Sequence, residues 1–209
     1  MLVRDIMSSP AIAISADTTL EVAYRTMREK NIRHFPVLDG GRLVGVITDR
    51  DLRLATSSLA ATPFPPVTPV SAVMSHPPVT ASGSDPVEDA ARTMRERKIG
   101  CLPVVDEGRL LGIITGLDLL DALMRMTGVD KPSGRLEVRL PDTPGALARL
   151  AGALSDRGLN VYSILSYPDG PRTVRTVLRL DTIDVRSLAR DLRHSEFDVL
   201  WPPEKAWLR

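Results

Sequence analysis

The pattern of apolar and polar residues over positions 1–60 predicts one small unit of strands and helices. Residues 12–14, 35–38 and 43–48 are short apolar runs, which are typical of strands. Four apolar side chains recur at helical spacing after the first run and form one face of a predicted helix: Leu20, Ala23, Tyr24 and Met27. A second helix is expected to begin at Thr48, so the order of elements is β-α-β-β-α.

The same order of residues recurs further along the chain. Moving the sequence by the 67 positions that separate Met7 from Met74 aligns two segments without a gap over roughly fifty positions, of which roughly half are identical. The longest matches pair 25–29 with 92–96 and 41–48 with 108–115. A supersecondary unit has been duplicated. Because one such unit is too small for a good core, the two copies are expected to pack face to face.

Residues with turn or capping chemistry mark the ends of these elements. Thr18 and Glu21 form the capping-box pattern, which predicts the start of the first helix. Pro86 is predicted at the first helical position of the second copy, where its missing N–H costs nothing. Residues 39–41 read Asp-Gly-Gly, which predicts a hairpin turn.

Two matching runs give the repeat a family resemblance. Residues 45–51 read Gly-Val-Ile-Thr-Asp-Arg-Asp, residues 112–118 read Gly-Ile-Ile-Thr-Gly-Leu-Asp, and each copy opens on Met-Ser-x-Pro. On these motifs, residues 1–126 resemble a tandem pair of the CBS domain family. The resemblance implies a pseudo-twofold pair, called a Bateman module. It also implies an adenine nucleotide (AMP, ADP, ATP or S-adenosylmethionine) bound as a regulatory ligand between the repeats, with no catalytic cofactor.

The residues of these motifs have chemistry that suits a nucleotide. Thr48 and Thr115 stand at predicted helix starts, where free N–H groups and the helix dipole favour a phosphate, and the Thr hydroxyl can donate a further hydrogen bond. Asp51 and Asp118 can accept the two hydrogen bonds of a ribose diol. The candidate nucleotide-binding residues are Ile12, Ala13, Ile14, Arg33, His34, Phe35, Thr48, Arg50, Asp51, Val79, Thr80, Ala81, Gly100, Cys101, Leu102, Thr115 and Asp118.

The Thr-x-x-Asp spacing also has a purely structural interpretation. It is a helix-capping arrangement that is worth about 1 kcal/mol without any ligand, and capping and binding can coexist. The two copies differ in charge, because Arg50 could pair with a phosphate and Leu117 replaces it in the second copy. We therefore expect two non-equivalent sites, with either both or only one of them occupied.

From Gly134 the pattern changes to a second kind of unit. Strands are predicted at 136–140, 160–167, 174–180 and 197–200, with helices after residue 145 and over 184–193. This β-α-β-β-α-β order is the ferredoxin-like arrangement. The whole chain is therefore predicted to be α+β.

Two short motifs connect this unit to a second family. Asp-x-Pro-Gly at 142–145 and Gly-Leu-Asn-Val at 158–161 resemble an ACT domain. The resemblance implies sheets that pair between subunits and an amino acid bound at their interface. The matched positions are Asp142, Thr143, Gly145, Ala146, Asn160 and Val161. Gly and Pro also satisfy the turn for backbone reasons alone, and many ACT-like domains only dimerise, so both interpretations stand.

Residues rich in Pro, Ser and Thr separate the predicted domains. The expected divisions are CBS repeat 1 at 1–60, a Pro-rich linker at 61–69, CBS repeat 2 at 70–127, a linker at 128–134, an ACT-like domain at 135–201 and a tail at 202–209. This domain order resembles the acetoin-utilization regulatory family.

Composition narrows the function classes. A net charge of +1 with 4% aromatic residues does not favour nucleic-acid binding. The apolar runs are too short to span a membrane, and the first residues lack the apolar core of a signal peptide. The single cysteine, Cys101, agrees with a reducing compartment, so we expect a cytoplasmic protein.

Motifs for catalysis or for a metal site are missing from the sequence. It contains no P-loop, no His-Glu-x-x-His and no paired cysteines. A thiol nucleophile at Cys101 with His34 as its base is one alternative, since the two occupy equivalent places in the repeats. We expect a non-catalytic, allosteric homodimer that senses an adenine nucleotide, with an amino acid and a partner enzyme as further candidate partners. The alternative is a structural dimerisation module with vestigial ligand sites.

Overall fold

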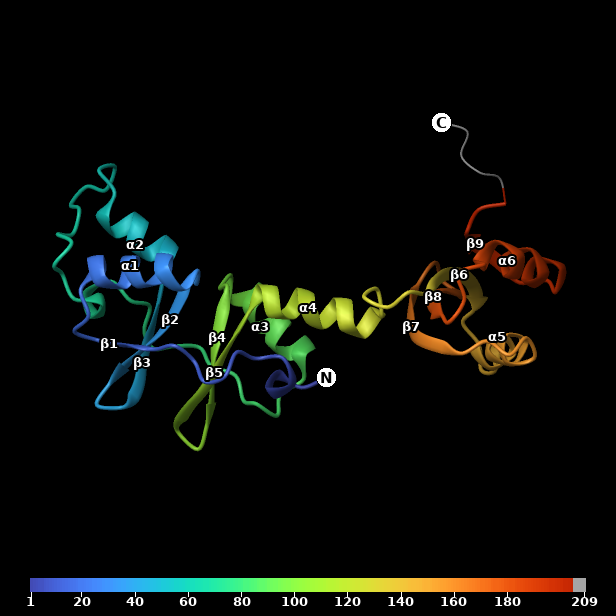
Figure 1. Ribbon diagram of the computed structural model, residues 1–209, viewed down its shortest axis with the longest axis horizontal. Coiled ribbons are helices and arrows are strands. Elements are labelled where there is room, and N and C mark those ends of the chain that lie inside the picture. Colours follow the sequence, from blue (N-terminus) through green and yellow to red (C-terminus); the bar gives the residue numbers. More distant parts are fainter. Residues whose placement is uncertain (205–209) are drawn as a thin grey trace. The chain divides into compact units, whose positions relative to one another are not determined.

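The computed structural model describes residues 1–204, and the tail residues 205–209 lie outside this description. The chain divides into two compact units, Met1–Ala122 and Leu123–Arg209 (Figure 1). Strands and helices alternate in both units, which confirms the predicted α+β class. No helix in the described range has the length and hydrophobicity needed to cross a lipid bilayer.

The first repeat has the predicted β-α-β-β-α order. Its elements are β1 (Ile14–Ser15), α1 (Leu20–Lys30), β2 (His34–Asp39), β3 (Arg42–Thr48) and α2 (Asp49–Thr56). Strand β1 runs parallel to β2, and β2 and β3 form an antiparallel hairpin. The hairpin turns at Gly40 and Gly41, both of which have positive φ, as the Asp-Gly-Gly run predicts.

The second repeat repeats this order with one strand reduced to a bridge. Its elements are α3 (Val87–Arg97), β4 (Cys101–Asp106), β5 (Arg109–Thr115) and α4 (Gly116–Thr127). Strands β4 and β5 form a two-stranded antiparallel sheet. Ala81 makes a single parallel bridge to Val104, in the place that β1 takes beside β2 in the first repeat.

The repeats exchange the segments that precede them. Val3, in a short 3-10 turn (Val3–Asp5), is fully buried in the core of the second repeat, although it begins the first repeat in the sequence. Val70, in the equivalent turn (Val70–Ala72), is fully buried in the core of the first repeat. Neither core is therefore built from one continuous stretch of chain.

This exchange explains two errors in the predicted helix starts. Thr19, not Thr18, caps α1, because its side chain accepts from the Val22 N–H while the carbonyl of Thr18 accepts a hydrogen bond from Val70. Pro86 precedes α3 instead of opening it, because it lies in extended backbone bridged to Leu2.

The apolar face predicted for α1 is correct for Leu20, Ala23 and Met27, which are buried. The predicted face also includes Tyr24, but this residue is 40% exposed. A helix surface that contacts a sheet covers only part of its circumference, and Tyr24 lies at the edge of that part.

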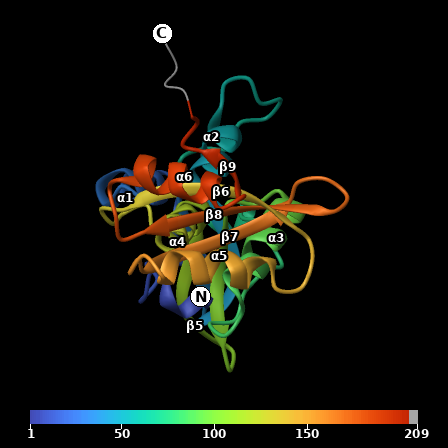
Figure 2. The same ribbon diagram turned by 90° about the vertical axis from the view of Figure 1, so that its right-hand side faces the viewer.

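The second unit has the predicted ferredoxin-like order. Its elements are β6 (Gly134–Pro141), α5 (Ala146–Ser155), β7 (Val161–Pro168), β8 (Thr173–Leu180), α6 (Val185–His194) and β9 (Asp198–Trp201). The sheet has the order β7-β8-β6-β9, and all its neighbouring strands are antiparallel. Helices α5 and α6 lie on one face of this sheet (Figure 2).

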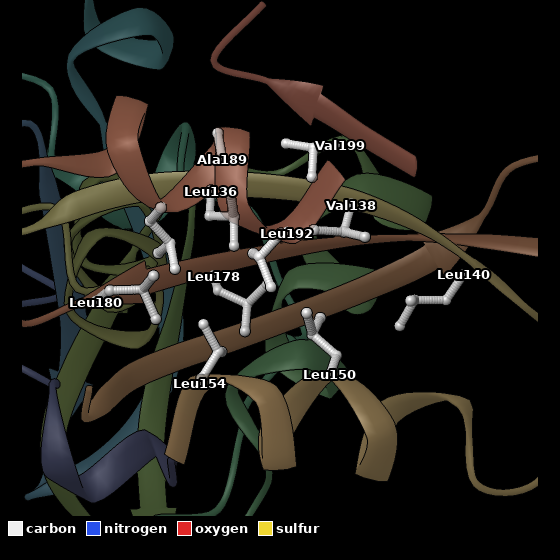
Figure 3. Close-up of a cluster of buried hydrophobic side chains, with 11 residues drawn as sticks. Leu136, Val138, Leu140, Leu150, Leu154, Leu178, Leu180, Ala189, Leu192 and Val199 are labelled. Carbon is white, nitrogen blue, oxygen red and sulfur yellow. The ribbon is translucent and has the colours of Figure 1, made fainter. Parts of the chain in front are cut away.

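Leucines from both helices and from the central strands fill the core of this unit. Figure 3 shows Leu150 and Leu154 of α5 close to Leu178 of β8, with Leu136 of β6 nearer to α6. These four side chains are at most 1% exposed. Burial of one leucine side chain contributes about 1.5–3 kcal/mol, so this cluster holds both helices against the sheet.

Candidate functional site

A cavity of about 660 Å³ lies between the two repeats. Its wall includes the start of α2 and the start of β2 from the first repeat, and the segment before β4 from the second. Eight of the candidate nucleotide-binding residues line it: Arg33, His34, Thr48, Arg50, Asp51, Val79, Gly100 and Cys101. The structure thus brings together residues that are far apart in the sequence.

A capping box fixes the start of α2 at this cavity. The Thr48 N–H and hydroxyl both donate to Asp51 Oδ2, at 2.9 Å and 2.7 Å, and the Asp51 N–H donates back to Thr48 Oγ1 at 3.2 Å. The Thr48 hydroxyl is therefore not free to donate to a phosphate, contrary to our expectation. Within residues 1–204, Asp51 Oδ1 accepts no hydrogen bond from the chain.

Hydrogen bonds within the chain also reduce the number of free N–H groups at the start of α2. Asp49 donates its N–H to the Arg33 carbonyl at 2.9 Å, and the Asp51 N–H is bound to Thr48. Of the first three amides of α2, only that of Arg50 keeps its hydrogen free among the described residues. The helix dipole still favours an anion at this end, but one N–H is available there instead of three.

The second repeat builds the same box from Thr115 and Asp118. The Thr115 N–H and hydroxyl donate to Asp118 Oδ2, both at 2.7 Å. Neither residue lines the cavity at Asp51. The two helix starts are thus equivalent in local structure, but only the first contributes to this cavity.

The remaining candidates also lie outside this cavity. Phe35 and Leu102 are at most 1% exposed, and their side chains pack in the cores of the first and the second repeat, as does that of Ala81 in the second. Ile12 is 45% exposed. The cavity lining also does not include Ala13, Ile14 or Thr80. The alternation of a strand explains the positions of Phe35 and Leu102, because each follows a residue that lines the cavity, His34 or Cys101, and points to the opposite face.

Two titratable side chains from different repeats meet at the cavity. Burial raises the pKa of the Cys101 thiol to about 12, and the negative charge of Asp51 adds to this rise. Burial and then the Arg33 charge lower the pKa of His34, against the opposing effect of Asp51 and Asp49. Cys101 is therefore a protonated thiol and His34 a neutral imidazole at neutral pH, which argues against the thiolate–imidazole alternative.

Three cationic side chains surround the cavity: Arg33, Arg50 and Lys98. Asp49, which also lines it, is already paired with Arg53 at 2.9 Å. Sequence reasoning missed Lys98, together with the apolar wall made by Pro77, Pro78 and Ile99. Lys98 caps the end of α3 at the place where Asn31 caps α1, so comparison of the repeats could have singled it out.

Comparison with known families decides what these repeats are. The protein-family model with the description "CBS domain" matches residues 3–58 and 70–125, which together make up more than half of the chain. The chain belongs to the CBS domain family. The model described as ACT domain matches residues 134–193, so a tandem CBS pair is followed by an ACT domain.

Known CBS proteins match this pair over nearly their whole length. A CBS domain-containing protein of Dictyostelium discoideum is 42% identical over 139 residues, which are 60% of this chain and 93% of the relative. Some matching relatives are enzymes. The homoserine O-acetyltransferase of Methanosphaerula palustris is 32% identical, but the match covers 24% of that enzyme. The similarity is thus to a module within the enzyme.

Solved CBS structures resemble the pair at a TM-score of 0.54. One is the CBS pair of protein MJ0100 with 5′-methylthioadenosine and S-adenosyl-L-methionine, 30% identical, covering 63% of this chain and 98% of that one. Another is an acetoin utilization protein (AcuB) from Vibrio cholerae, 31% identical, covering 64% and 98%. CBSX2 in complex with AMP is 28% identical, covering 60% and 97%.

The candidate amino-acid site of the ACT domain is divided within one chain. Asp142, Thr143, Gly145 and Ala146 follow the end of β6, where Pro141 pairs with Thr173 at the start of β8. Asn160 and Val161 lie at the other end of the sheet, where Val161 pairs with Leu180. The eight residues of β8 separate the two groups by about 23 Å at the usual rise of a strand. One domain therefore does not bring them together.

Proposed function

We propose that this protein is a non-catalytic regulatory sensor whose CBS pair binds an adenine nucleotide in the cavity at Asp51. The observation that carries the proposal is the convergence, in one cavity of about 660 Å³, of the α2 start with residues of the second repeat. Ligand pockets usually measure about 300–1,000 Å³. Related CBS pairs hold AMP, 5′-methylthioadenosine or S-adenosylmethionine.

Each part of a nucleotide has a matching group in this cavity. Asp51 Oδ1 can accept hydrogen bonds from a ribose diol while Oδ2 stays in the capping box. Pro78 and Val79 offer an apolar wall for the adenine ring. The Arg50 N–H, at the positive end of the α2 dipole, offers a contact for a phosphate oxygen.

The position of the cavity gives the ligand a means of regulation. A nucleotide there would contact both repeats and would stabilise whichever packing of the repeats it fits best. Coupling to the ACT domain or to a partner enzyme requires that the ligand prefers one of two arrangements. The CBS pair thus acts as the sensor, and the partner enzyme carries the activity that is regulated.

The candidate amino-acid-binding residues of the ACT domain lie at opposite ends of its sheet, which favours a homodimer. If Asp142 and Asn160 both contact an amino acid, the two must come from different copies of the chain, because about 23 Å separates them within one domain. A second copy could bring these ends together by pairing sheets. The amino-acid site and the dimer are therefore linked proposals.

A structural role for the repeats is the second candidate. It is favoured by the capping boxes, which satisfy Thr48 and Thr115 within the chain and are alike in both repeats. In that case the boxes stabilise the fold by about 1 kcal/mol each and no ligand is needed.

Thermal unfolding with a panel of ligands separates the two candidates. AMP, ADP, ATP, S-adenosylmethionine and the standard amino acids would be added to the full chain at millimolar concentration. A ligand at a hundred times its dissociation constant adds about 2.7 kcal/mol to the stability of the folded state, which raises the melting temperature by a few degrees. If no member of the panel shifts the melting temperature, the structural role is favoured and the sensor proposal fails.

A further inference from the structure

The charges around the cavity are not balanced. Arg33, Arg50 and Lys98 bring three positive charges, against the two carboxylates of Asp49 and Asp51. Asp49 also forms an ion pair with Arg53, which does not line the cavity. His34 adds no charge at neutral pH, because burial lowers its pKa. An anionic group of the ligand would relieve the excess of positive charge.

The cations come from both repeats. Arg33 and Arg50 belong to the first repeat, and Lys98 belongs to the second. Arg33 directly precedes β2, Arg50 lies in the first turn of α2, and Lys98 is the C-cap of α3. An anion held by all three would therefore link the repeats to each other.

Lys98 occupies a backbone position that suits another residue better. It has a φ of +56°, and Asn31, its counterpart in the first repeat, has a φ of +52°. Asn tolerates this left-handed conformation, whereas a lysine with its β-carbon pays a conformational cost there. Lys98 is therefore not the residue that the backbone alone favours at this C-cap, and it lines the cavity.

The positions related by the internal repeat lack these charges. Asn31 stands in place of Lys98, Leu117 in place of Arg50, and Asp121 in place of Leu54. The mirrored set consists of the residues that lie 67 positions from those lining the cavity. It has two carboxylates, Asp118 and Asp121, and its one cation is Arg33, which takes the place of Gly100. A phosphate would therefore be attracted to the cavity at Asp51 and not to the mirrored positions.

We propose that Arg33, Arg50 and Lys98 hold the 5′-phosphate of a single adenine nucleotide, so that the protein binds one 5′-phosphorylated adenosine per chain and discriminates against S-adenosylmethionine. The inference rests on the proposed function of the cavity. S-adenosylmethionine carries a sulfonium cation on C5′, where AMP carries a phosphate with a charge of about −1.5 to −2 at neutral pH. The same three cations attract the phosphate and repel the sulfonium.

Calorimetric titration of the full chain tests this selection. AMP, ADP, adenosine, 5′-methylthioadenosine and S-adenosylmethionine would be titrated at two salt concentrations. We expect one AMP per chain, bound at least about tenfold more tightly than adenosine or S-adenosylmethionine. The affinity for AMP should fall as salt rises, and the affinity for adenosine should not.

A pair of matched variants tests the residues. Lys98→Asn introduces the residue of the other repeat, which suits the left-handed backbone. It should lower the affinity for AMP about tenfold and leave the affinity for adenosine unchanged. Arg97→Asn removes an equal charge from the neighbouring position, which does not line the cavity, and should change neither affinity. If Lys98→Asn fails to fold, Arg50→Leu makes the same test with the residue of the second repeat.

The outcomes separate this inference from the function on which it rests. If adenosine or S-adenosylmethionine binds as tightly as AMP, the phosphate selection is wrong and the sensor function stands. The selection is also wrong if two AMP molecules bind with equal affinity, or if Lys98→Asn and Arg97→Asn behave alike. If neither ATP nor any of the five compounds binds at millimolar concentration, the proposed function itself is wrong.

Discussion

A β-carbon on Gly112 would lie 2.6 Å from the carbonyl oxygen of Ser8, although the two residues belong to different repeats. Ser8 and Ile113 also exchange two backbone hydrogen bonds, Ser8 N–H to Ile113 O at 2.9 Å and Ile113 N–H to Ser8 O at 3.0 Å. The motif glycine therefore makes room for the segment that the first repeat contributes to the second. Its role is in the packing of the pair and not in contact with a ligand.

Gly112→Ala is expected to destabilise the protein by about 2 kcal/mol, because backbone must move to admit the methyl group. Gly45→Ala should cost less, since its closest neighbour is the flexible Met74 side chain. Urea denaturation would measure both changes. Gly116→Ala is the control, because nothing lies within 4 Å of its added carbon. Equal stabilities for Gly112→Ala and Gly116→Ala would contradict the packing role.

Asp51→Ala and Asp118→Ala should each lose about 1 kcal/mol of folding stability, since both remove a capping carboxylate. Only Asp51→Ala should also lower the affinity for the nucleotide, because only Asp51 lines the cavity. Denaturation and AMP titration of the two variants would measure these effects separately. An equal loss of AMP affinity in both variants would place ligand binding at both helix starts.

Cys101 should be unreactive toward a thiol reagent such as iodoacetamide in the folded protein at neutral pH. Burial raises its pKa to about 12, so the thiolate that attacks the reagent is scarce, and the side chain is 4% exposed. Labelling followed by mass spectrometry would measure the rate, with the urea-unfolded chain as the control. Rapid labelling of the folded chain would contradict the assigned burial and restore a nucleophilic role.

His34 should make the protein less stable as pH falls. Its pKa is lowered from 6.5 in the folded state, so the unfolded chain takes up the proton first. The stability that His34 contributes is therefore complete above about pH 6.5 and is lost progressively below it. Urea denaturation at about pH 7.5 and about pH 5.5 should give a smaller loss for His34→Gln than for the unchanged protein. The same loss in both proteins would show that other groups cause it.

Two of the errors in the sequence prediction share one origin, which is the arrival of a distant segment. Thr19 caps α1 because Val70, distant in the sequence, binds the carbonyl of Thr18. Lys98 went unnoticed because only the folded pair brings it to the cavity with Arg50. Turns such as Gly40–Gly41 were predicted correctly because their signal is contained in adjacent residues. The signal of this turn was reliable because no distant segment competes for its backbone groups.

The amino-acid sequence by itself determined the duplicated β-α-β-β-α unit, the ferredoxin-like order of the second domain and the capping residues at Thr48 and Thr115. These features depend on periodicity and short-range hydrogen bonds, which adjacent residues specify. The tertiary structure alone decided that Val3 and Val70 exchange cores, and that one helix start shares a cavity with residues of the other repeat. Burial and charge depend on which distant segments meet, and packing of the whole chain sets those meetings.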